Sequence, residues 1–321
     1  MVSNMRFNKN KKLISIGIPS FNEELNVIPI YIALKKITEK IKKYNFEFIF
    51  VDNGSTDATR EKITELVSKD ACVVGVFLSR NFGPEASGQA ALDYTSGDAF
   101  ICMSCDLQEP PSMIPKFIKK WEEGYNVVFG IYSKSTDSIF MTVMRRLFYF
   151  VYKKISNINV PVNATGFSLI DNNVIEALKM LPEKYRFNRG LKVWVGYKTA
   201  YIRYDKGKRM RGKSSYYIFD YIKHAERGVF GFSYLLLDGI IYLGFILVGL
   251  SFLFIVLYLF LSFLYGNPIK GAVTILVSIV FFGGVNLLGL SIIGKYIQVI
   301  VEETKHRPMY IVEDSTKNNF T

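Results

Sequence analysis

Two oxygen-bearing side chains, Asp106 and Gln108, follow an apolar run in the N-terminal half of the sequence. The run at 98–102 has the character of a buried β-strand, and Pro110 and Pro111 prevent the strand from continuing. A carboxylate with an amide oxygen two residues later suits a hard divalent cation that bridges diphosphate oxygens. Taken alone, the pair equally fits a helix-capping Asp and a solvated Gln in a loop.

Further polar clusters follow other apolar runs in the same way. Strands are expected at 13–19, 46–51, 73–78, 100–103 and 126–132, and at 197–204 on the edge of the sheet, with helices at 27–44, 59–68, 84–93, 112–124 and 172–181. This alternation predicts a parallel sheet with right-handed crossovers. In such a sheet the loops at the carboxyl ends of the strands share one rim. The residues expected to converge there are Asn22, Glu23, Asp52, Arg80, Asp106 and Gln108.

The densest positive charge lies in a glycine-punctuated segment at 206–216, which contains Arg209, Arg211 and Lys213. A basic segment of this kind suits an oligophosphate or an anionic headgroup. As an alternative, a basic loop next to a membrane binds lipid by charge alone. An aromatic-rich basic helix expected at 140–155 would either lie in a bilayer interface or pack in the core with its charges solvated.

The C-terminal part of the chain contains a region that is almost free of charge. Lys270 is the one charged residue from Gly239 to Gly294. The stretches 239–265 and 272–293 are each long enough to span ~30 Å of hydrocarbon as a helix. The short turn between them predicts a hairpin with both ends on one side, and the positive-inside rule puts that side in the cytoplasm.

The formal net charge of +12 is compatible with nucleic acid, an anionic membrane face or phosphorylated substrates. Basic residues concentrate on both sides of the apolar region, which favours the membrane, and no nucleic-acid-binding motif is present. Residues 1–12 have no apolar core, so no signal peptide is expected there. The expected organisation is a cytosolic α/β domain at 1–230 with a basic juxtamembrane loop at 205–227, two transmembrane helices within 231–300, and a cytosolic tail at 301–321.

Six stretches in this order resemble the motifs of the family 2 inverting glycosyltransferases, which have the GT-A fold. More narrowly, the chain resembles the polyprenyl-phosphate glycosyltransferases related to dolichyl-phosphate mannose synthase and the bactoprenol glucosyltransferases. The stretches are 18–24, 51–57, 78–83, 106–111, 186–194 and 209–216. Each is weak alone, but their order together with the apolar hairpin is specific. The resemblance implies an α/β, Rossmann-like, mostly parallel sheet followed by a two-helix transmembrane hairpin.

The resemblance also implies a role for each group of polar residues. Those implied to line the nucleotide-sugar pocket are Pro19, Asn22, Glu23, Asp52, Asn53, Arg80 and Asp106. Asp106 and Gln108 would hold Mg²⁺ or Mn²⁺ on the donor diphosphate. Those implied to bind the acceptor or its phosphate are Arg189, Arg209, Arg211, Lys213 and Ser214, and the implied catalytic residues are Asp106, Arg209 and Lys213.

Two positions depart from the family pattern. Ser104 stands where the first Asp of an Asp-x-Asp motif is usual, and Gly166 stands where related enzymes often have an Asp near the acceptor. A hydroxyl is a poorer metal ligand than a carboxylate, so metal affinity is expected to be lower. The change at Gly166 is tolerable for a lipid phosphate acceptor, since a phosphate monoester is already anionic at neutral pH and attacks without a general base.

The expected function is therefore inverting transfer of one sugar from a nucleotide sugar, by resemblance a UDP-sugar, to undecaprenyl or dolichyl phosphate at the cytoplasmic membrane. A homo-oligomer is compatible with this interpretation. One alternative is a processive polysaccharide synthase, although such enzymes usually have a Gln-x-x-Arg-Trp motif and more membrane helices than this chain offers. The other is a catalytically silent nucleotide-sugar-binding membrane scaffold, which Ser104 and Gly166 would explain.

Overall fold

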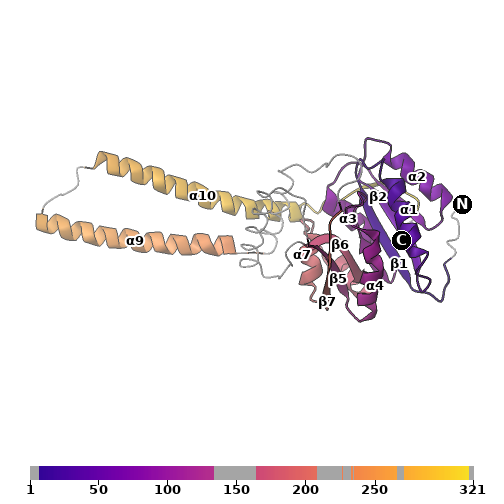
Figure 1. Cartoon of the computed structure of the whole chain (residues 1–321). Helices are drawn as coiled ribbons and strands as arrows, with labels where there is room; N and C mark the ends of the chain where they lie inside the picture. Colours follow the sequence, from indigo (N-terminus) through magenta and orange to yellow (C-terminus); the bar gives the residue numbers. More distant parts are fainter. Residues whose placement is uncertain are drawn as a thin grey trace.

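The computed structural model describes residues 7–133, 164–207, 226, 233, 235–265 and 271–317 of the 321-residue chain. An α/β domain is followed by two long helices that extend away from it side by side (Figure 1). The strands are β1 (Leu13–Ser20), β2 (Asn45–Asp52), β3 (Val73–Leu78), β4 (Ala99–Cys102), β5 (Val127–Tyr132), β6 (Ala164–Asp171), β7 (Thr199–Tyr204) and β8 (Val312–Ser315). The helices are α1 (Val27–Thr38), α2 (Thr59–Lys69), α3 (Pro84–Asp93), the 3-10 helix η1 (Pro111–Met113), α4 (Ile114–Glu122), α6 (Asn172–Met180), α7 (Asn188–Trp194), α9 (Leu235–Tyr265) and α10 (Ala272–Thr304).

All eight strands belong to one sheet, in the order β7-β5-β6-β4-β1-β2-β3-β8. The four strands β4, β1, β2 and β3 run parallel to one another. They read as nearly continuous apolar runs because helices cover both faces of a parallel sheet and bury most of its side chains. The strands expected at 13–19, 46–51 and 73–78 are confirmed within one residue.

The other half of the sheet is mixed. β6 pairs antiparallel with both β4 and β5, whereas β5 pairs parallel with β7. β5 and β7 therefore point in the same direction as β4, and the start of β6 lies at the edge where β4 ends. β7 lies at the end of the sheet, as the edge strand expected at 197–204.

Two hydrophobic layers sandwich the sheet. Side chains of α1, α2 and α4 pack on one face, and side chains of α3, α6 and α7 pack on the other. The second layer approaches closely at Gly17, where an added Cβ would lie 2.6 Å from the ring of Phe100 and 2.8 Å from Ala91 in α3. A glycine in β1 and small residues in α3 are thus required by the same close approach.

The helices α9 and α10 form the expected apolar hairpin. The candidate membrane spans within them are Leu237–Leu261 and Ser278–Thr304, with mean hydropathies of 2.8 and 1.6. Their described side chains are mostly exposed, including Phe263 at 87%. So much exposed apolar surface indicates association with a membrane rather than with water. Both helices are longer than predicted, since α9 begins at Leu235 and α10 continues to Thr304.

The C-terminal segment returns to the α/β domain. The tail expected from 301 begins inside α10, and after His306 the chain runs along the sheet as β8. β8 pairs antiparallel with β3, at the opposite end of the sheet from β7. The two ends of the hairpin are thereby attached to the same domain.

Candidate active site at the carboxyl ends of the strands

The predicted rim is present at the carboxyl ends of the parallel strands. The loop after β1 carries Asn22 and Glu23, β2 ends at Asp52, Arg80 follows β3, and the loop after β4 carries Asp106 and Gln108. Because these strands are neighbours in the sheet, the four loops lie along one edge. The structure thus places every rim residue named from the sequence at the expected edge.

The loops after β1 and β2 are joined by Asn22. Its backbone N–H donates to Ser55 Oγ at 2.9 Å, and its side-chain Oδ1 accepts from the N–H of Thr56 at 2.9 Å. The backbone of Asn22 is left-handed, with a φ of 54°, a conformation that Asn tolerates better than most residues. Glu23 follows, and its N–H donates to Thr59 Oγ1 at 2.8 Å. These contacts join the loops after β1 and β2 into one wall of the rim.

Asp52 and Asn53 lie buried behind this wall. Burial raises the pKa of Asp52, while the carboxylate accepts the backbone N–H of Ser55 at 3.1 Å. The side chain of Asn53 reaches the loop after β3, where it donates to Asn81 Oδ1 at 3.0 Å and accepts from the N–H of Phe82 at 3.0 Å. The loops after β1, β2 and β3 therefore form one hydrogen-bonded unit.

Arg80 is the exposed cation of this unit. Its guanidinium lies 4.0 Å from the ring centroid of Phe82 and donates to the carbonyl oxygen of Asn81 at 3.1 Å. Stacking on an aromatic ring limits the directions in which an arginine points. The side chain is thus held at the rim with its charge accessible to an anion.

The loop after β4 has a strained turn at its centre. Leu107 has a φ of 59°, which is rare for a residue with a branched, bulky side chain. The turn allows Asp106 Oδ1 to accept the N–H of Gln108 at 3.1 Å. Strain of this kind costs about 1–3 kcal/mol and is most often kept where the resulting geometry is used.

Glu109 supports the same loop and was not predicted from the sequence. Its Oε2 accepts the backbone N–H of Ser104 at 2.7 Å, and the residue is buried. Burial, with a smaller contribution from the charge of Asp106, raises the pKa of Glu109 to about 7, against the lowering effect of the hydrogen bond from the Ser104 N–H. The only sequence signal was a third oxygen-bearing side chain directly after Gln108.

Asp106 and Gln108 offer oxygen ligands alone, which suits Mg²⁺ or Mn²⁺. Among the described residues, no group of three or more His, Cys, Asp or Glu side chains is arranged to hold a metal ion. A cation bound here would therefore take most of its ligands from the donor diphosphate and water. The residues fit a cation that binds together with a nucleotide, and they do not form a closed structural metal site.

Arg189, which the resemblance implies to bind the acceptor, lies in α7. Its guanidinium donates to the carbonyl oxygen of Ala164 at 2.8 Å and lies 5.2 Å from the ring of Phe187. Ala164 is the first residue of β6, so Arg189 stands at the rim. Gly166 is exposed nearby, and an added Cβ there would meet nothing within 4 Å.

Lys192, one turn further along α7, was also not predicted. It is buried, it donates to Ser168 Oγ at 2.8 Å, and burial lowers its pKa. Its charge interacts with Glu85 and Glu109. A buried cation thus lies behind the β4 loop, at a position that no motif marks.

Pro19, also predicted to line the nucleotide-sugar pocket, is the penultimate residue of β1 at the rim, whereas the predicted residues of the basic segment are not placed by the structure. Arg209, Arg211, Lys213 and Ser214 lie outside the described residues, as does the helix expected at 140–155. Their assignments stay predictions.

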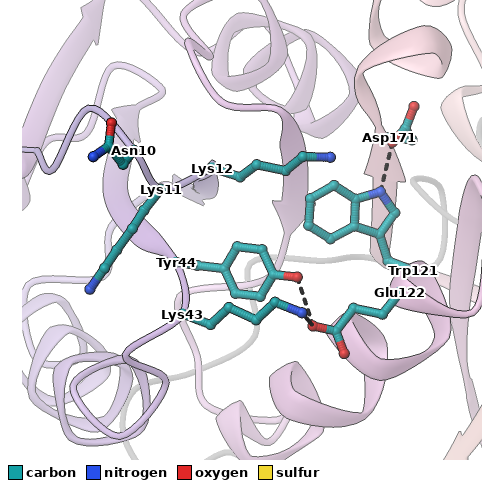
Figure 2. A pocket seen from close by; sticks show the side chains of 8 residues that line it. All are labelled: Asn10, Lys11, Lys12, Lys43, Tyr44, Trp121, Glu122 and Asp171. Carbon is teal, nitrogen blue, oxygen red and sulfur yellow. Dashed lines mark hydrogen bonds and ion pairs between the residues drawn. The ribbon is translucent and has the colours of Figure 1, made fainter.

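A separate hollow of about 550 Å³ lies at the opposite edge of the sheet (Figure 2). Lys12 and Tyr44, which line it, directly precede β1 and β2, so this is the amino-terminal edge of the parallel strands. Its polar groups bind one another: Glu122 accepts from Tyr44 at 2.7 Å, and Trp121 Nε1 donates to Asp171 at 2.7 Å. We therefore assign the candidate site to the rim and not to this hollow.

Comparisons with known proteins identify the family and support the fold. Residues 15–179, from β1 to α6, match the family model described as Glycosyl transferase family 2. The bactoprenol glucosyl transferase of Shigella phage SfV is 36% identical over 302 residues, which cover 94% of this chain and 98% of that protein. The putative glycosyltransferase CsbB of Bacillus subtilis is 34% identical over 307 residues, with 96% and 93% covered.

Among solved structures, glucosyl-3-phosphoglycerate synthase from Mycobacterium tuberculosis, in complex with Mn²⁺, UDP and glucosyl-3-phosphoglycerate, is 17% identical with a TM-score of 0.47. The match covers 68% of this chain and 78% of that one. The expected fold, a mostly parallel α/β sheet of the GT-A type followed by two long apolar helices, is confirmed. The chain is a glycosyltransferase and belongs to glycosyl transferase family 2.

Proposed function

We propose that this enzyme transfers one sugar, with inversion, from a nucleotide-sugar donor to a polyprenyl phosphate in the cytoplasmic membrane. The names of the relatives that match nearly the whole chain support bactoprenol as the acceptor. A UDP-sugar is the proposed donor on the basis of the resemblance described above. We further propose that the α/β domain and both termini face the cytosol.

The observation that carries this proposal is where the hairpin joins the domain. After β7 the chain leaves the rim toward α9, and the N–H of Gly207 donates to the carbonyl oxygen of Gln108 at 2.9 Å. After α10 the chain returns at the rim end of β3, where the N–H of Ser79 donates to the carbonyl oxygen of Ile311 at 3.0 Å. The described parts of both connections lie at the carboxyl-end edge of the sheet, which supports a site that faces the membrane helices.

This arrangement suits an acceptor that is held in a bilayer. The phosphate of a polyprenyl phosphate lies at headgroup depth, and an active site next to the helix ends reaches that depth. A water-soluble acceptor would require no such placement. The apolar hairpin and the rim thus support the same class of acceptor.

The donor would lie across the loops after β1, β2 and β4. In this proposal Pro19, Asn22, Glu23, Asp52 and Asn53 form the nucleoside side, and Arg80 faces the diphosphate. Asp106 and Gln108 would hold Mg²⁺ or Mn²⁺. When bound, the cation would neutralise charge on the departing nucleoside diphosphate.

The acceptor phosphate would be held by Arg189 together with the basic segment that contains Arg209, Arg211, Lys213 and Ser214. One phosphate oxygen attacks the anomeric carbon, and the bond from that carbon to the diphosphate oxygen breaks, so the nucleoside diphosphate leaves with the bonding electrons. The phosphate is already anionic, and no side chain has to remove a proton. The protein's contribution is orientation and charge stabilisation.

The test uses the purified full-length protein in detergent with undecaprenyl phosphate, Mg²⁺ or Mn²⁺ and a panel of labelled UDP- and GDP-sugars. Label that enters the organic-soluble lipid from one donor, and that is lost with EDTA, is the expected result. Nucleotide binding without label transfer from any donor would overturn the proposal in favour of the silent scaffold. Label in a growing polymer instead of a lipid monophosphate would favour the synthase.

A further inference from the structure

The last turn of α10 holds the loop between α6 and α7. The carboxylate of Glu303 accepts the backbone N–H of Lys184 at 2.9 Å and that of Tyr185 at 2.7 Å. Hydrogen bonds to a charged acceptor are stronger than neutral ones. This loop leads directly into α7, which carries Arg189. A membrane helix thus contacts the loop that leads into the helix proposed to hold the acceptor phosphate.

Beyond α10 the chain is paired along β3 from Ile311 to Thr316. Val312 lies opposite Leu78, and Ser315 lies opposite Val76. The pairing is extended by Thr316, whose N–H donates to the carbonyl oxygen of Gly75 at 3.0 Å. Without β8, β3 would be an edge strand with unpaired backbone groups. The pairing thus both protects the sheet and attaches the chain end to it.

Ion pairs fasten the same segment at two further points. Arg60 in α2 lies 2.6 Å from Glu313 in β8. Lys317 lies 3.5 Å from the fully buried carboxylate of Glu47 in β2 and donates to the carbonyl oxygen of Tyr94 at 2.7 Å. Exposed pairs such as the first contribute little to stability, but the pair with Glu47 is shielded from water. The C-terminal part of the return segment is therefore attached to both α2 and β2.

A partly buried chain of hydrogen-bonded side chains links the return segment to the same loop that Glu303 holds. Tyr310 donates to Asp93 Oδ2 at 2.6 Å, Gln89 Nε2 donates to Asp93 Oδ1 at 2.7 Å, and Arg186 donates to Gln89 Oε1 at 2.8 Å. Arg186 also donates to the carbonyl oxygens of Leu178 and Leu181. The loop before α7 is thus hydrogen-bonded both to α10 and, through these side chains, to the segment that follows α10.

We propose that residues 303–317 form a strap that fixes the height and tilt of the glycosyltransferase domain on its membrane helices. In this proposal, which rests on the lipid-phosphate acceptor proposed above, Glu303 and Tyr310 are positioning residues. They keep α7 and the rim where the phosphate of a bilayer-embedded acceptor lies. The segment that precedes α9 would otherwise be the domain's only covalent connection to the hairpin.

The physical reason is orientation. An acceptor in a bilayer is confined to one depth, so a domain that rocks on its anchor presents the rim correctly for only part of the time. A short-chain, water-soluble prenyl phosphate approaches the rim from any direction, and the strap should not affect its use. The two acceptors therefore separate positioning from chemistry.

The experiment compares Glu303→Gln and Tyr310→Phe with the wild type in proteoliposomes. Undecaprenyl phosphate serves as the embedded acceptor, and a short-chain prenyl phosphate serves as the soluble one. We expect the KM for undecaprenyl phosphate to rise about tenfold, with the kcat/KM for the soluble acceptor and the Kd for UDP unchanged. The matched controls are Glu302→Gln, an exposed neighbour in the same turn, and Tyr197→Phe, a partly exposed tyrosine away from the strap.

Equal losses with both acceptors would overturn the proposal, because they would indicate damage to the catalytic centre. Unchanged kinetics with both acceptors would overturn it as well. Hydrogen exchange of the same variants is independent of the reaction: faster exchange at Lys184 and Tyr185, with α1 unchanged, is expected in Glu303→Gln. If the wild type transfers no sugar to lipid, the acceptor assignment fails, and unchanged exchange in the variants would then separately reject the strap.

Discussion

The N–H of Gly207 donates to the carbonyl oxygen of Gln108 at 2.9 Å. This bond joins the chain that leaves β7 for the membrane hairpin to the loop that carries Asp106. An added Cβ at Gly207 would lie 3.4 Å from the carbonyl oxygen of Leu107, so the approach is close. The proposed metal-binding loop and the start of the basic segment are thus mechanically coupled.

Asp106→Asn tests the centre of that loop. The amide keeps the shape and can still accept the N–H of Gln108, but it removes the charge that a divalent cation needs. We expect kcat to fall by about 100-fold or more, in the range seen when a charge-stabilising group is lost. We also expect the Mn²⁺-dependent gain in UDP affinity to disappear, while UDP affinity in EDTA stays as in the wild type.

The matched control is Asp98→Asn at the opposite edge of the sheet, where Asp98 accepts the N–H of Leu13 at 2.8 Å. It should leave both measurements unchanged. Wild-type transfer by Asp106→Asn, or loss of UDP binding in EDTA, would contradict the metal role assigned to this carboxylate.

Arg189→Lys tests the acceptor side. Lysine keeps the positive charge but lacks the planar guanidinium group, which can donate to the carbonyl oxygen of Ala164 and to a ligand at the same time. The KM for undecaprenyl phosphate should rise about tenfold, and the Kd for UDP should not change. Arg203→Lys, at an exposed position of β7, is the control. A weaker UDP affinity in Arg189→Lys would place this arginine on the donor instead.

Gly54 closes the wall between the loops after β2 and β3. Its φ is 69°, and an added Cβ would lie 2.4 Å from the backbone carbon of Arg80. We expect Gly54→Ala to lower the free energy of unfolding by about 3 kcal/mol, from the left-handed backbone and the steric clash together. UDP affinity should also fall, because Arg80 and its loop must shift.

Gly124→Ala isolates the two contributions. Gly124 has a φ of 84°, but nothing lies within 4 Å of an added Cβ. The free energy of unfolding of this variant should fall by about 1 kcal/mol, which is the cost of the left-handed backbone alone. Its UDP affinity should not change. The measurement is thermal unfolding in detergent. Equal losses of unfolding free energy in the two variants would show that the loops around Gly54 move to accommodate the added Cβ without a steric cost.

The central strands were predictable because each is an apolar run that ends in polar residues.

The helix expected at 27–44 was too long, and the structure shows why. α1 ends at Thr38, but Ile41 and Tyr44 still pack on the core from the following turns. The helical spacing of apolar residues therefore continues beyond the end of the helix. Such spacing indicates which side chains are buried, but it does not indicate where the backbone hydrogen bonds of the helix end.

β8 illustrates what local patterns do not contain. Its residues Val312–Ser315 include Glu313 and Asp314 and give no strand signal. The strand forms because β3 offers an unpaired edge more than 230 residues away in sequence. Glu109 and Lys192 escaped prediction for a similar reason, since their burial depends on how distant elements pack. The rim itself was predictable, because strand direction places the loops before any contact is known.

Asp70 gives a prediction on pH. Burial would raise its pKa, but the ammonium of Lys35 at 2.5 Å, the hydroxyl of Tyr31 and the N–H of Cys72 lower it to about 2 from 3.8. A carboxyl group with a lowered pKa stabilises the fold above its unfolded pKa, and this contribution is lost as the pH falls. This contribution to the free energy of unfolding should disappear between pH about 4 and about 2. It should amount to about 1 kcal/mol, because partial exposure of the ion pair to solvent weakens it.

Urea unfolding at pH 5 and at pH 2.5 measures this contribution. The wild type should lose more stability between these two values than Asp70→Asn does, by that increment. Lys35→Gln removes the cation and should weaken the pH dependence in the same direction. An identical pH dependence in the wild type and both variants would show that the pair contributes nothing.

The proposed orientation predicts which parts of the chain an impermeant reagent reaches in intact cells. Cys72, Cys102 and Cys105 belong to the α/β domain, so the unmodified protein should not react with a membrane-impermeant maleimide. Asn267→Cys places a thiol between the two spans, and Thr316→Cys places one beyond β8 on the domain side. With the domain in the cytosol, only Asn267→Cys should be labelled in intact cells, and permeabilisation should expose the cysteine at 316.

Because β8 is part of the same sheet as β3, both ends of the hairpin must lie on one side of the membrane. Labelling at 316 in intact cells would therefore place the whole catalytic domain outside, where no cytosolic nucleotide sugar reaches it.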